Sequence, residues 1–257
     1  MEAIDFAKQK NLPFFLLGGG SNILFNDSGY DGVIIKIQLG GLKINGRRII
    51  AGAGVLLSQL INNSVDSNLA GLEWGVGIPG TIGGAVNGNA GAYGSSISEK
   101  VESVVVLDEN GQEKKYLKEE CNFKYRRSKF KRLDNKEIIV EVELKLEPGD
   151  KEKSRATMKD ILAQRKGKIP PQPSAGCVFK NIKSEKGELI AAVGALIEQC
   201  ELKCSRIGGA EIPSIHGNYI VNIGGAKAAD IVAIINLCKQ KVKEKFNIDL
   251  EEEIVVL

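Results

Sequence analysis

Short apolar runs, most of them bounded by glycine, proline or polar residues, alternate along the chain with segments of helical spacing. Apolar or alternating runs of about four to eight residues are typical of strands, whereas apolar positions three and four apart are typical of amphipathic helices. The strands over 101–107 and 112–117 flank an Asp108-Glu-Asn-Gly111 turn and form a predicted hairpin. The full pattern predicts helices over residues 1–10, 56–67, 151–166, 189–201 and 226–246, and strands over 12–17, 32–37, 48–52, 101–107, 112–117, 137–146, 219–223 and 250–257.

The strand signals stop at the Glu147-Pro-Gly-Asp-Lys151 turn, where a charged helix begins. We place a domain boundary there because a proline-glycine pair beside charged residues is typical of a connection. A chain of 257 residues can bury two cores. The mixture of elements predicts the α+β class, with residues 1–150 and 151–257 as the two domains.

Composition and charge narrow the class of partner. The net charge is +3, from 35 basic and 32 acidic residues that are mixed along the chain, so no nucleic-acid partner is expected. No apolar run approaches about eighteen residues, and no secretory signal is visible. We therefore predict a cytoplasmic protein that does not enter the membrane.

Two glycine-rich segments have the composition of ligand-binding loops. Residues 77–94 contain seven glycines, which excludes an ordinary helix or strand, and their regularly placed apolar residues disfavour a flexible linker. The other segment, Gly18-Gly-Gly-Ser-Asn22, follows the predicted strand at 12–17. Uncovered backbone N–H groups bind anions such as a pyrophosphate. We therefore expect one extended phosphorylated ligand to cross both segments.

Gly75-Val-Gly-Ile-Pro-Gly80 fits the dinucleotide-binding pattern G-x-G-x-x-G. That pattern has meaning only between a buried strand and a helix, and the residues before it here are mixed and polar. We therefore do not interpret it as a Rossmann fingerprint.

The five cysteines and the single histidine limit the chemistry further. An odd number of cysteines without framework spacing predicts reduced thiols. Cys200 and Cys204 with one histidine in the whole chain do not make a zinc site, so we predict no metal. His216 adjoins a strand-like run and is better explained as a structural or substrate-facing residue than as the base of a catalytic triad.

Three further clusters carry candidate chemistry: Asn122-Phe-Lys-Tyr-Arg-Arg-Ser-Lys-Phe130, Ser174-Ala-Gly-Cys-Val-Phe-Lys-Asn181 and Glu251-Glu-Glu253. Taken singly, they are better explained as a solvated basic face, a core cysteine and an acidic turn. In their order along the chain, and together with the glycine segments and His216-x-Asn-Tyr-Ile-Val-Asn222, they resemble the UDP-N-acetylenolpyruvoylglucosamine reductase (MurB) family of flavoenzymes. The resemblance covers nearly the whole chain.

The resemblance implies a two-lobed FAD-binding region of the vanillyl-alcohol-oxidase (PCMH) type, with lobes at residues 1–37 and 38–150. An α/β substrate-binding domain at 151–257 would follow. The chain resembles the shorter second subtype, because no inserted tyrosine loop stands between Ser128 and Ser174. The implied FAD-binding residues are Gly18, Gly19, Gly20, Ser21, Asn22, Gly77, Ile78, Pro79, Gly80, Thr81, Gly83, Gly84, Asn89, Gly91 and Ala92.

The implied reaction is the NADPH-dependent reduction of UDP-N-acetylglucosamine enolpyruvate to UDP-N-acetylmuramate, by ping-pong hydride transfer through FAD in a monomer. Arg126 would grip the substrate carboxylate, and Glu253 would stabilise the enolate beside it. Cys177 stands where the best-known members have serine. It would protonate the enolate, since a thiol is a stronger acid than a hydroxyl. The positions that match substrate-binding residues are Tyr125, Lys168 and Asn181.

The start of the chain departs from the family pattern. Members begin with a strand and a Thr-x-x-x-Gly-Gly-like loop before the helix in which Met1 already lies, which implies an N-terminally truncated sequence or a smaller first FAD lobe. This departure keeps open a second function, a sugar-nucleotide-binding protein without flavin. A separate alternative is another FAD-dependent oxidase of the superfamily. An oxidase would turn over with oxygen and without NADPH.

Overall fold

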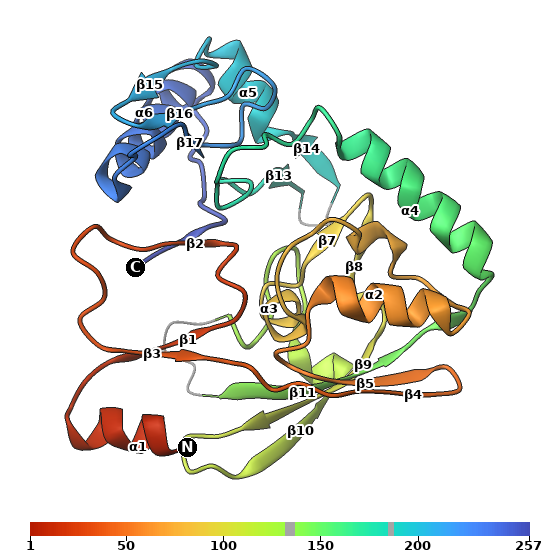
Figure 1. Cartoon of the computed structure of the whole chain (residues 1–257). Coiled ribbons are helices and arrows are strands. Elements are labelled where there is room, and N and C mark those ends of the chain that lie inside the picture. The colour runs from red at the N-terminus through yellow and green to blue at the C-terminus, as the bar shows by residue number, and fades with distance from the viewer. Residues whose placement is uncertain (132–136, 185–187) are drawn as a thin grey trace. The chain divides into compact units, whose positions relative to one another are not determined.

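The structure, a computed structural model, describes residues 1–131, 137–184 and 188–257. Contacts divide it into two compact units (Figure 1): residues 1–20 with 31–163, and residues 21–30 with 164–257. The predicted boundary at 150/151 differs from this division, because most of helix α4 (Lys151–Arg165) belongs to the first unit. Ser154 of α4 donates a hydrogen bond to Glu73 at 2.6 Å and is buried together with Met158, which packs the helix on that unit.

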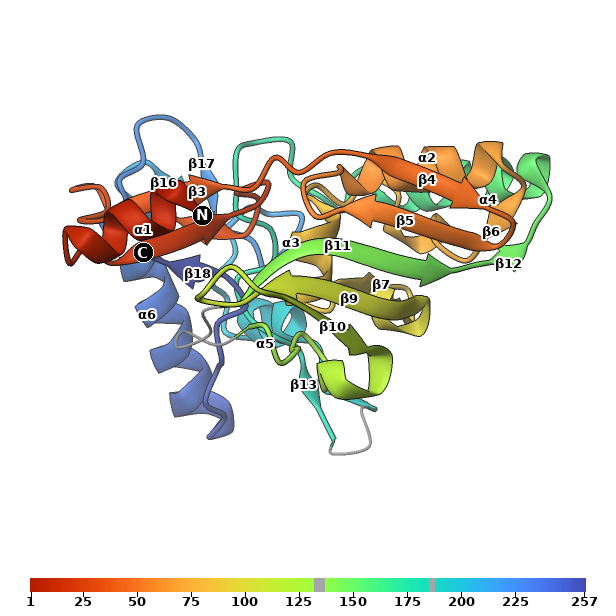
Figure 2. The same ribbon diagram turned by 90° about the horizontal axis from the view of Figure 1, so that it is seen from below.

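The largest sheet of the first unit has five antiparallel strands in the order β10-β9-β11-β5-β4. Helices α2 (Leu57–Asp66) and α3 (Ile82–Asn87) lie on one face of it, and Figure 2 shows the strands from the opposite side. Alternate strand residues point into the core, because successive side chains of a strand face opposite ways. The strands are β4 (Leu42–Asn45), β5 (Arg48–Gly52), β9 (Val101–Leu107), β10 (Glu113–Leu117) and β11 (Ile138–Lys145).

The core of the first unit lies between this sheet and α2. Val104, Val142 and Leu144 of the sheet and Leu57 and Leu60 of α2 are almost completely buried in one hydrophobic cluster. Smaller elements complete the unit. They are α1 (Glu2–Gln9), the parallel pair β1 (Phe14–Leu17) and β3 (Val33–Lys36), β6 (Leu69–Ala70) with β12 (Glu147–Pro148), the hairpin β7 (Gly91–Ala92) and β8 (Ser95–Ser96), and the 3-10 turns η1 (Glu73–Gly75), η2 (Ile97–Glu99) and η3 (Lys118–Cys121).

The second unit packs two helices, α5 (Val193–Gln199) and α6 (Ala228–Phe246), against short strands. Its segment 21–30 joins the terminal strand, because β2 (Ile23–Leu24) pairs in parallel with β18 (Val255–Val256). The same segment meets α6, where the Asp27 carboxylate accepts hydrogen bonds from the first backbone N–H groups of the helix. The remaining strands are β13 (Ile182–Lys183), β14 (Leu189–Ala191), β15 (Arg206–Ile207), β16 (Ala210–Glu211) and β17 (Val221–Asn222).

Two sequence predictions need correction. The helix over 189–201 is wrong at its start, because Leu189–Ala191 pair as a strand with β13 and only Val193–Gln199 are helical. Residues 77–94 do contain a helix, α3, and the first strand of the β7–β8 hairpin. Thr81 caps α3 by accepting a hydrogen bond from the Gly84 N–H, and the apolar residues of α3 enter the core. The hairpin over 101–117, the helices over 56–67 and 226–246, and the strand over 48–52 are confirmed within a few residues.

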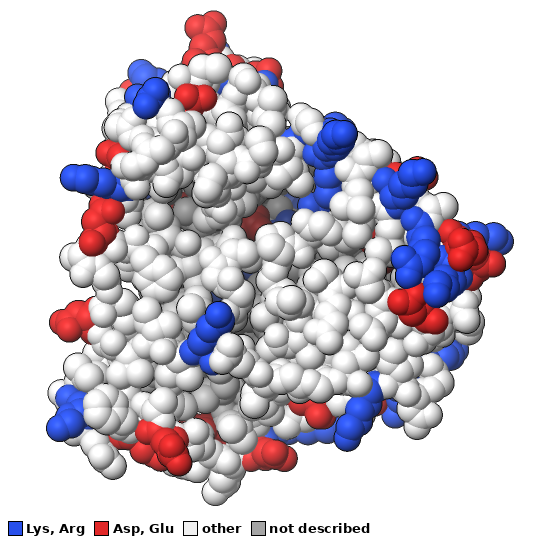
Figure 3. All heavy atoms as spheres, viewed as in Figure 1, with Lys and Arg blue, Asp and Glu red and all other residues white. Residues whose placement is uncertain are grey.

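Figure 3 shows Lys and Arg side chains beside Asp and Glu side chains, mainly around the edge of the face that it draws. Within the described ranges, every helix is too short or too polar to cross a bilayer.

Candidate active site

The two glycine segments meet backbone to backbone in the first unit. A Cβ on Gly19 would lie 2.8 Å from the Cα of Gly80, and a Cβ on Gly18 would lie 2.9 Å from the Thr81 hydroxyl. Gly20 and Gly77 have φ near +72° and +76°, a conformation that L side chains rarely adopt. Glycine is therefore required here for close approach, and the structure brings together the two loops that the sequence predicts to share a ligand.

The second glycine loop is fixed to the body of the first unit. The carbonyl of Gly80 accepts a hydrogen bond from the Leu57 N–H at 3.0 Å, and the Gly83 N–H donates to the Ala53 carbonyl at 2.9 Å. A Cβ on Gly91 would lie 2.4 Å from the Ser95 carbonyl oxygen, so the β7–β8 hairpin also needs a glycine. The loop is held from both ends.

Arg126 sits at the tip of a tight turn. The backbones of Lys124 and Arg127 exchange two hydrogen bonds, of 2.9 and 3.1 Å, and Arg126 between them has φ near +53°. A non-glycine residue in the left-handed region costs about 1 kcal/mol or more and persists only where its surroundings hold it. The guanidinium carbon lies 5.2 Å from the centroid of the Tyr125 ring, so the two side chains stack.

Two buried side chains tie this turn to the second glycine loop. Asn89 donates from Nδ2 to the Lys124 carbonyl at 2.9 Å, and Ser128 donates from Oγ to the Asn87 carbonyl at 2.7 Å. Asn89 and Ser128 are 6% and 2% exposed, so both bonds are shielded from water. Asn89, predicted as a flavin contact, thus also positions the turn that carries Arg126.

Cys177 and Glu253 lie on neighbouring extended segments of the second unit. Gly176 has φ near +84° and makes a turn just before Cys177. The backbone of Cys177 forms an isolated antiparallel β-bridge with Tyr219. On the other side, the Glu253 N–H donates to the Val178 carbonyl at 2.7 Å. The structure therefore brings together the predicted proton donor and the predicted C-terminal glutamate.

Asn218 holds the segment after Cys177 in place. Its Oδ1 accepts from the Phe179 N–H at 2.9 Å and its Nδ2 donates to the Phe179 carbonyl at 2.8 Å, while its own N–H donates to Nδ1 of His216 at 3.1 Å. Asn218 is 3% exposed. Burial lowers the pKa of His216, so its ring is neutral at pH 7 and can accept this hydrogen bond.

We expect Asn218→Ala to lower the free energy of unfolding by about 2–4 kcal/mol, because it leaves a buried N–H and a buried carbonyl of Phe179 unpaired, each costing about 1–3 kcal/mol. Urea denaturation measures the change. Asn62→Ala, which removes a hydrogen bond on the exposed side of α2, is the control and should stay within about 0.5 kcal/mol. An equal effect of both variants would contradict the buried contact.

Burial, together with the charge and a side-chain hydrogen bond of the neighbouring Cys177, raises the pKa of Tyr219 to about 12. Arg165 acts in the opposite direction, and Glu253 adds a smaller rise. These four side chains thus share one electrostatic environment within the second unit. Tyr219 and Asn218 lie in the motif at residues 216–222, but the sequence alone assigns a role to neither residue.

Four further predicted site residues, Ser21, Asn22, Lys168 and Asn181, also lie in the second unit. Ser21 and Asn22, predicted as flavin contacts, belong to the second unit, and Asn22 donates from Nδ2 to the Glu253 carbonyl at 3.0 Å. Asn181 accepts from the Val193 N–H at the start of α5 at 3.1 Å. Lys168 is exposed in the turn after α4. Glu253 lies before β18 (Val255–Val256), whereas the sequence predicted it in the last strand. Asn22 helps to fix the segment that carries Glu253, a contact that the sequence did not predict.

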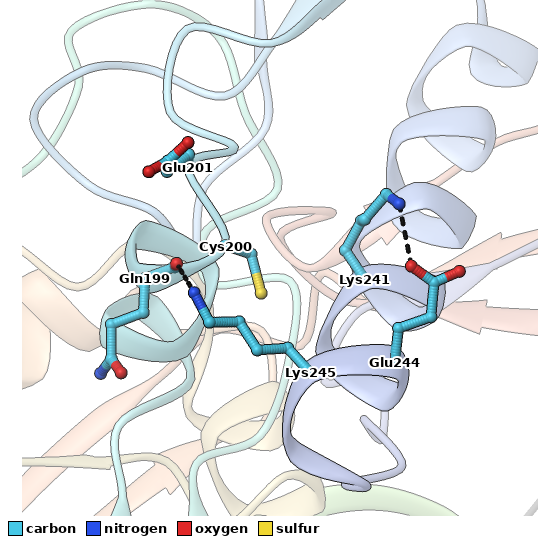
Figure 4. A pocket seen from close by; sticks show the side chains of 6 residues that line it. All are labelled: Gln199, Cys200, Glu201, Lys241, Glu244 and Lys245. Atoms are coloured by element: carbon cyan, nitrogen blue, oxygen red, sulfur yellow. Dashed lines mark hydrogen bonds and ion pairs between the residues drawn. The ribbon is translucent and has the colours of Figure 1, made fainter.

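A shallow pocket of about 350 Å³ lies away from these motifs, between the end of α5 and the last turns of α6 (Figure 4). In it Lys245 donates to the Gln199 carbonyl, and Lys241 pairs with Glu244 at 2.8 Å. Burial raises the pKa of the Cys200 thiol, which keeps it protonated at neutral pH. The Lys245 bond joins the two helices, whereas the Lys241–Glu244 pair lies within α6.

Two families of known domains match the chain. Residues 1–116 match the FAD binding domain, and residues 169–257 match the UDP-N-acetylenolpyruvoylglucosamine reductase C-terminal domain. The UDP-N-acetylenolpyruvoylglucosamine reductases of Clostridium novyi and Clostridium tetani are each 40% identical over 256 residues, which cover 99% of this chain and 81% of theirs.

A solved structure agrees with these matches. The crystal structure of UDP-N-acetylenolpyruvylglucosamine reductase (MurB) from Thermus caldophilus superposes with a TM-score of 0.80 at 35% identity, over 98% of this chain and 88% of that one. The similarity spans both units and both predicted domains. The chain therefore belongs to the UDP-N-acetylenolpyruvoylglucosamine reductase (MurB) family, with an FAD-binding domain of the PCMH type followed by the C-terminal domain of that family.

Proposed function

We propose that this chain reduces UDP-N-acetylglucosamine enolpyruvate to UDP-N-acetylmuramate with electrons from NADPH, a step of peptidoglycan precursor synthesis. The observation that carries the proposal is 40% identity to reductases of that name along the whole chain. The placement of Cys177 and Glu253 on adjacent segments supports it.

The first unit fits FAD as the cofactor. Its two glycine loops approach so closely that a Cβ at Gly19 would collide with Gly80. Gly19 and Gly20 are exposed and have no side chains to cover their backbone amides. These amides would bind the pyrophosphate of FAD. When bound, FAD would supply the hydride-carrying chemistry that links NADPH to the methylene carbon of the enolpyruvyl group.

The residues of the two units would divide the remaining work. Hydride addition to the methylene carbon leaves negative charge on the neighbouring carbon and the carboxylate, as an enolate. Arg126 would bind the carboxylate with two parallel N–H donors, and Glu253 would stabilise the enolate in its protonated form. Cys177 would transfer its S–H proton to the carbon next to the carboxylate and remain as a thiolate until solvent reprotonates it. The residues that would hold the sugar nucleotide are Tyr125, Lys168 and Asn181.

NADPH and the enolpyruvyl sugar would use the enzyme in turn, in a ping-pong sequence. NADPH would reduce the flavin and leave before the second substrate enters. The two half-reactions can therefore be measured separately by the colour of the flavin.

We expect the purified protein to be yellow, to bleach with NADPH, and to regain its colour under anaerobic conditions only after the enolpyruvyl sugar nucleotide is added. Visible absorbance recorded after each addition tests this. Recolouring by oxygen alone, without any response to the sugar nucleotide, would indicate an oxidase. A protein that stays colourless with added FAD yet binds the sugar nucleotide would indicate a binding protein.

A further inference from the structure

Tyr219 lies beside the proposed proton donor. Cys177 and Tyr219 form an antiparallel bridge, and side chains of directly opposed residues in such a bridge lie on the same side, with Cβ atoms about 4.5–5.5 Å apart. A side-chain hydrogen bond with Cys177 is also one of the causes that raise the pKa of Tyr219. The backbone therefore places the phenol against the thiol.

The tyrosine ring also packs against His216. The His216 ring packs edge-on against it, with centroids 4.7 Å apart and an interplanar angle of 66°. The Tyr219 N–H also donates to the His216 carbonyl at 3.2 Å, and the Asn218 N–H donates to the imidazole. The phenol thus has one neighbour that fixes its ring and another that takes its hydrogen bond.

The phenol can act as the donor in this pair because it holds its proton tightly. Burial, together with the charge and a side-chain hydrogen bond of Cys177, raises the pKa of Tyr219 to about 12. The phenol therefore keeps its proton well above about pH 8.5, the usual pKa of a thiol, and can donate it to a thiolate at Cys177. The other charged groups that act on Tyr219 are Arg165, which favours its ionised form, and Glu253, which opposes it.

We propose that Tyr219 is a positioning residue for Cys177, donating its O–H to the sulfur so that the S–H stays free to point at the substrate and the thiolate left after proton transfer is stabilised. The catalytic half of this inference rests on the proposed function. The contact between phenol and sulfur does not, so the two can be tested apart.

The test compares Tyr219→Phe with the wild type. Phenylalanine keeps the ring against His216 and removes only the hydroxyl. The matched control is Tyr116→Phe, which removes the hydroxyl that donates to Glu137 in the first unit. For each protein, iodoacetamide labelling of Cys177 is followed by peptide mass spectrometry across pH, and both flavin half-reactions are timed.

We expect Tyr219→Phe to raise the pH of half-maximal Cys177 labelling by about one unit, because the thiolate loses a hydrogen bond to a charged group. Reoxidation of the reduced flavin by the enolpyruvyl sugar should slow about tenfold, with the NADPH step unchanged. The Tyr116→Phe control should match the wild type in all three measurements.

A labelling midpoint that stays in place in Tyr219→Phe, or moves equally in the control, would overturn the inference. If the midpoint rises but the wild-type protein never reacts with the enolpyruvyl sugar, the contact stands and the proposed function fails.

Discussion

Cys177→Ala should leave the NADPH half-reaction at its wild-type rate and slow reoxidation of the flavin by the enolpyruvyl sugar at least about 100-fold. The reason is that a positioned general acid contributes about 10²–10⁴ to the rate of the step in which its proton moves. NADPH oxidation involves no proton from this thiol. Stopped-flow absorbance, with each substrate mixed separately, resolves the two steps.

Two further variants make this result specific. Cys177→Ser keeps a proton-bearing group at the same place and should recover part of the lost rate, although a hydroxyl is the weaker acid. Cys204→Ala removes an exposed thiol of the same unit and should match the wild type. Loss of the NADPH step in Cys177→Ala, or full activity in it, would contradict the assigned role.

Local patterns predicted those elements whose stability is local or whose periodicity is strong. Apolar spacing predicts helix α6 and strand β5, and the Asp-Glu-Asn-Gly turn predicts the hairpin of β9 and β10. The pattern wrongly predicted Leu189–Ala191 as helix, because a continuous apolar run next to a helix has no feature that marks it as a strand. Pairing with β13 makes this segment a strand. Such pairing depends on partners that no local window contains.

The helix in the second glycine loop was missed for a related reason. Glycine costs about 1 kcal/mol in a helix relative to alanine, so three apolar residues between glycines did not predict α3. Ile82, Ala85 and Val86 nevertheless have helical spacing, and burial of this face against the sheet outweighs the glycine cost.

In the candidate site, too, sequence motifs predict some features and only the folded structure shows the others. The motifs pointed to Arg126, Cys177 and Glu253 through their resemblance to a family. The contacts that hold them join distant parts of the chain, as in the hydrogen bond from Asn22 to Glu253 across 231 positions. Spacing in the sequence carries no information about such a bond, so the hydrogen bonds made by Asn218 and Ser128 became visible only in the structure.

Gly19→Ala is expected to lose FAD. Its new Cβ would stand 2.8 Å from the Cα of Gly80, and because this neighbour is backbone the two glycine loops must move apart. Overpacking of this kind costs about 1–3 kcal/mol, which corresponds to a loss of about tenfold or more in FAD affinity when the strain falls on the bound arrangement of the loops. The FAD-to-protein ratio after purification and a titration with added FAD measure the effect.

Gly40→Ala is the matched control for this variant. Gly40 belongs to the same unit, its φ lies outside the left-handed region, and a Cβ there would meet nothing within 4 Å. It should retain FAD as the wild type does, because a methyl group in open space strains neither loop. If Gly19→Ala also retained FAD at the wild-type ratio, contact between the two loops would not be needed for the cofactor. The proposal that FAD lies along both of them would then be wrong.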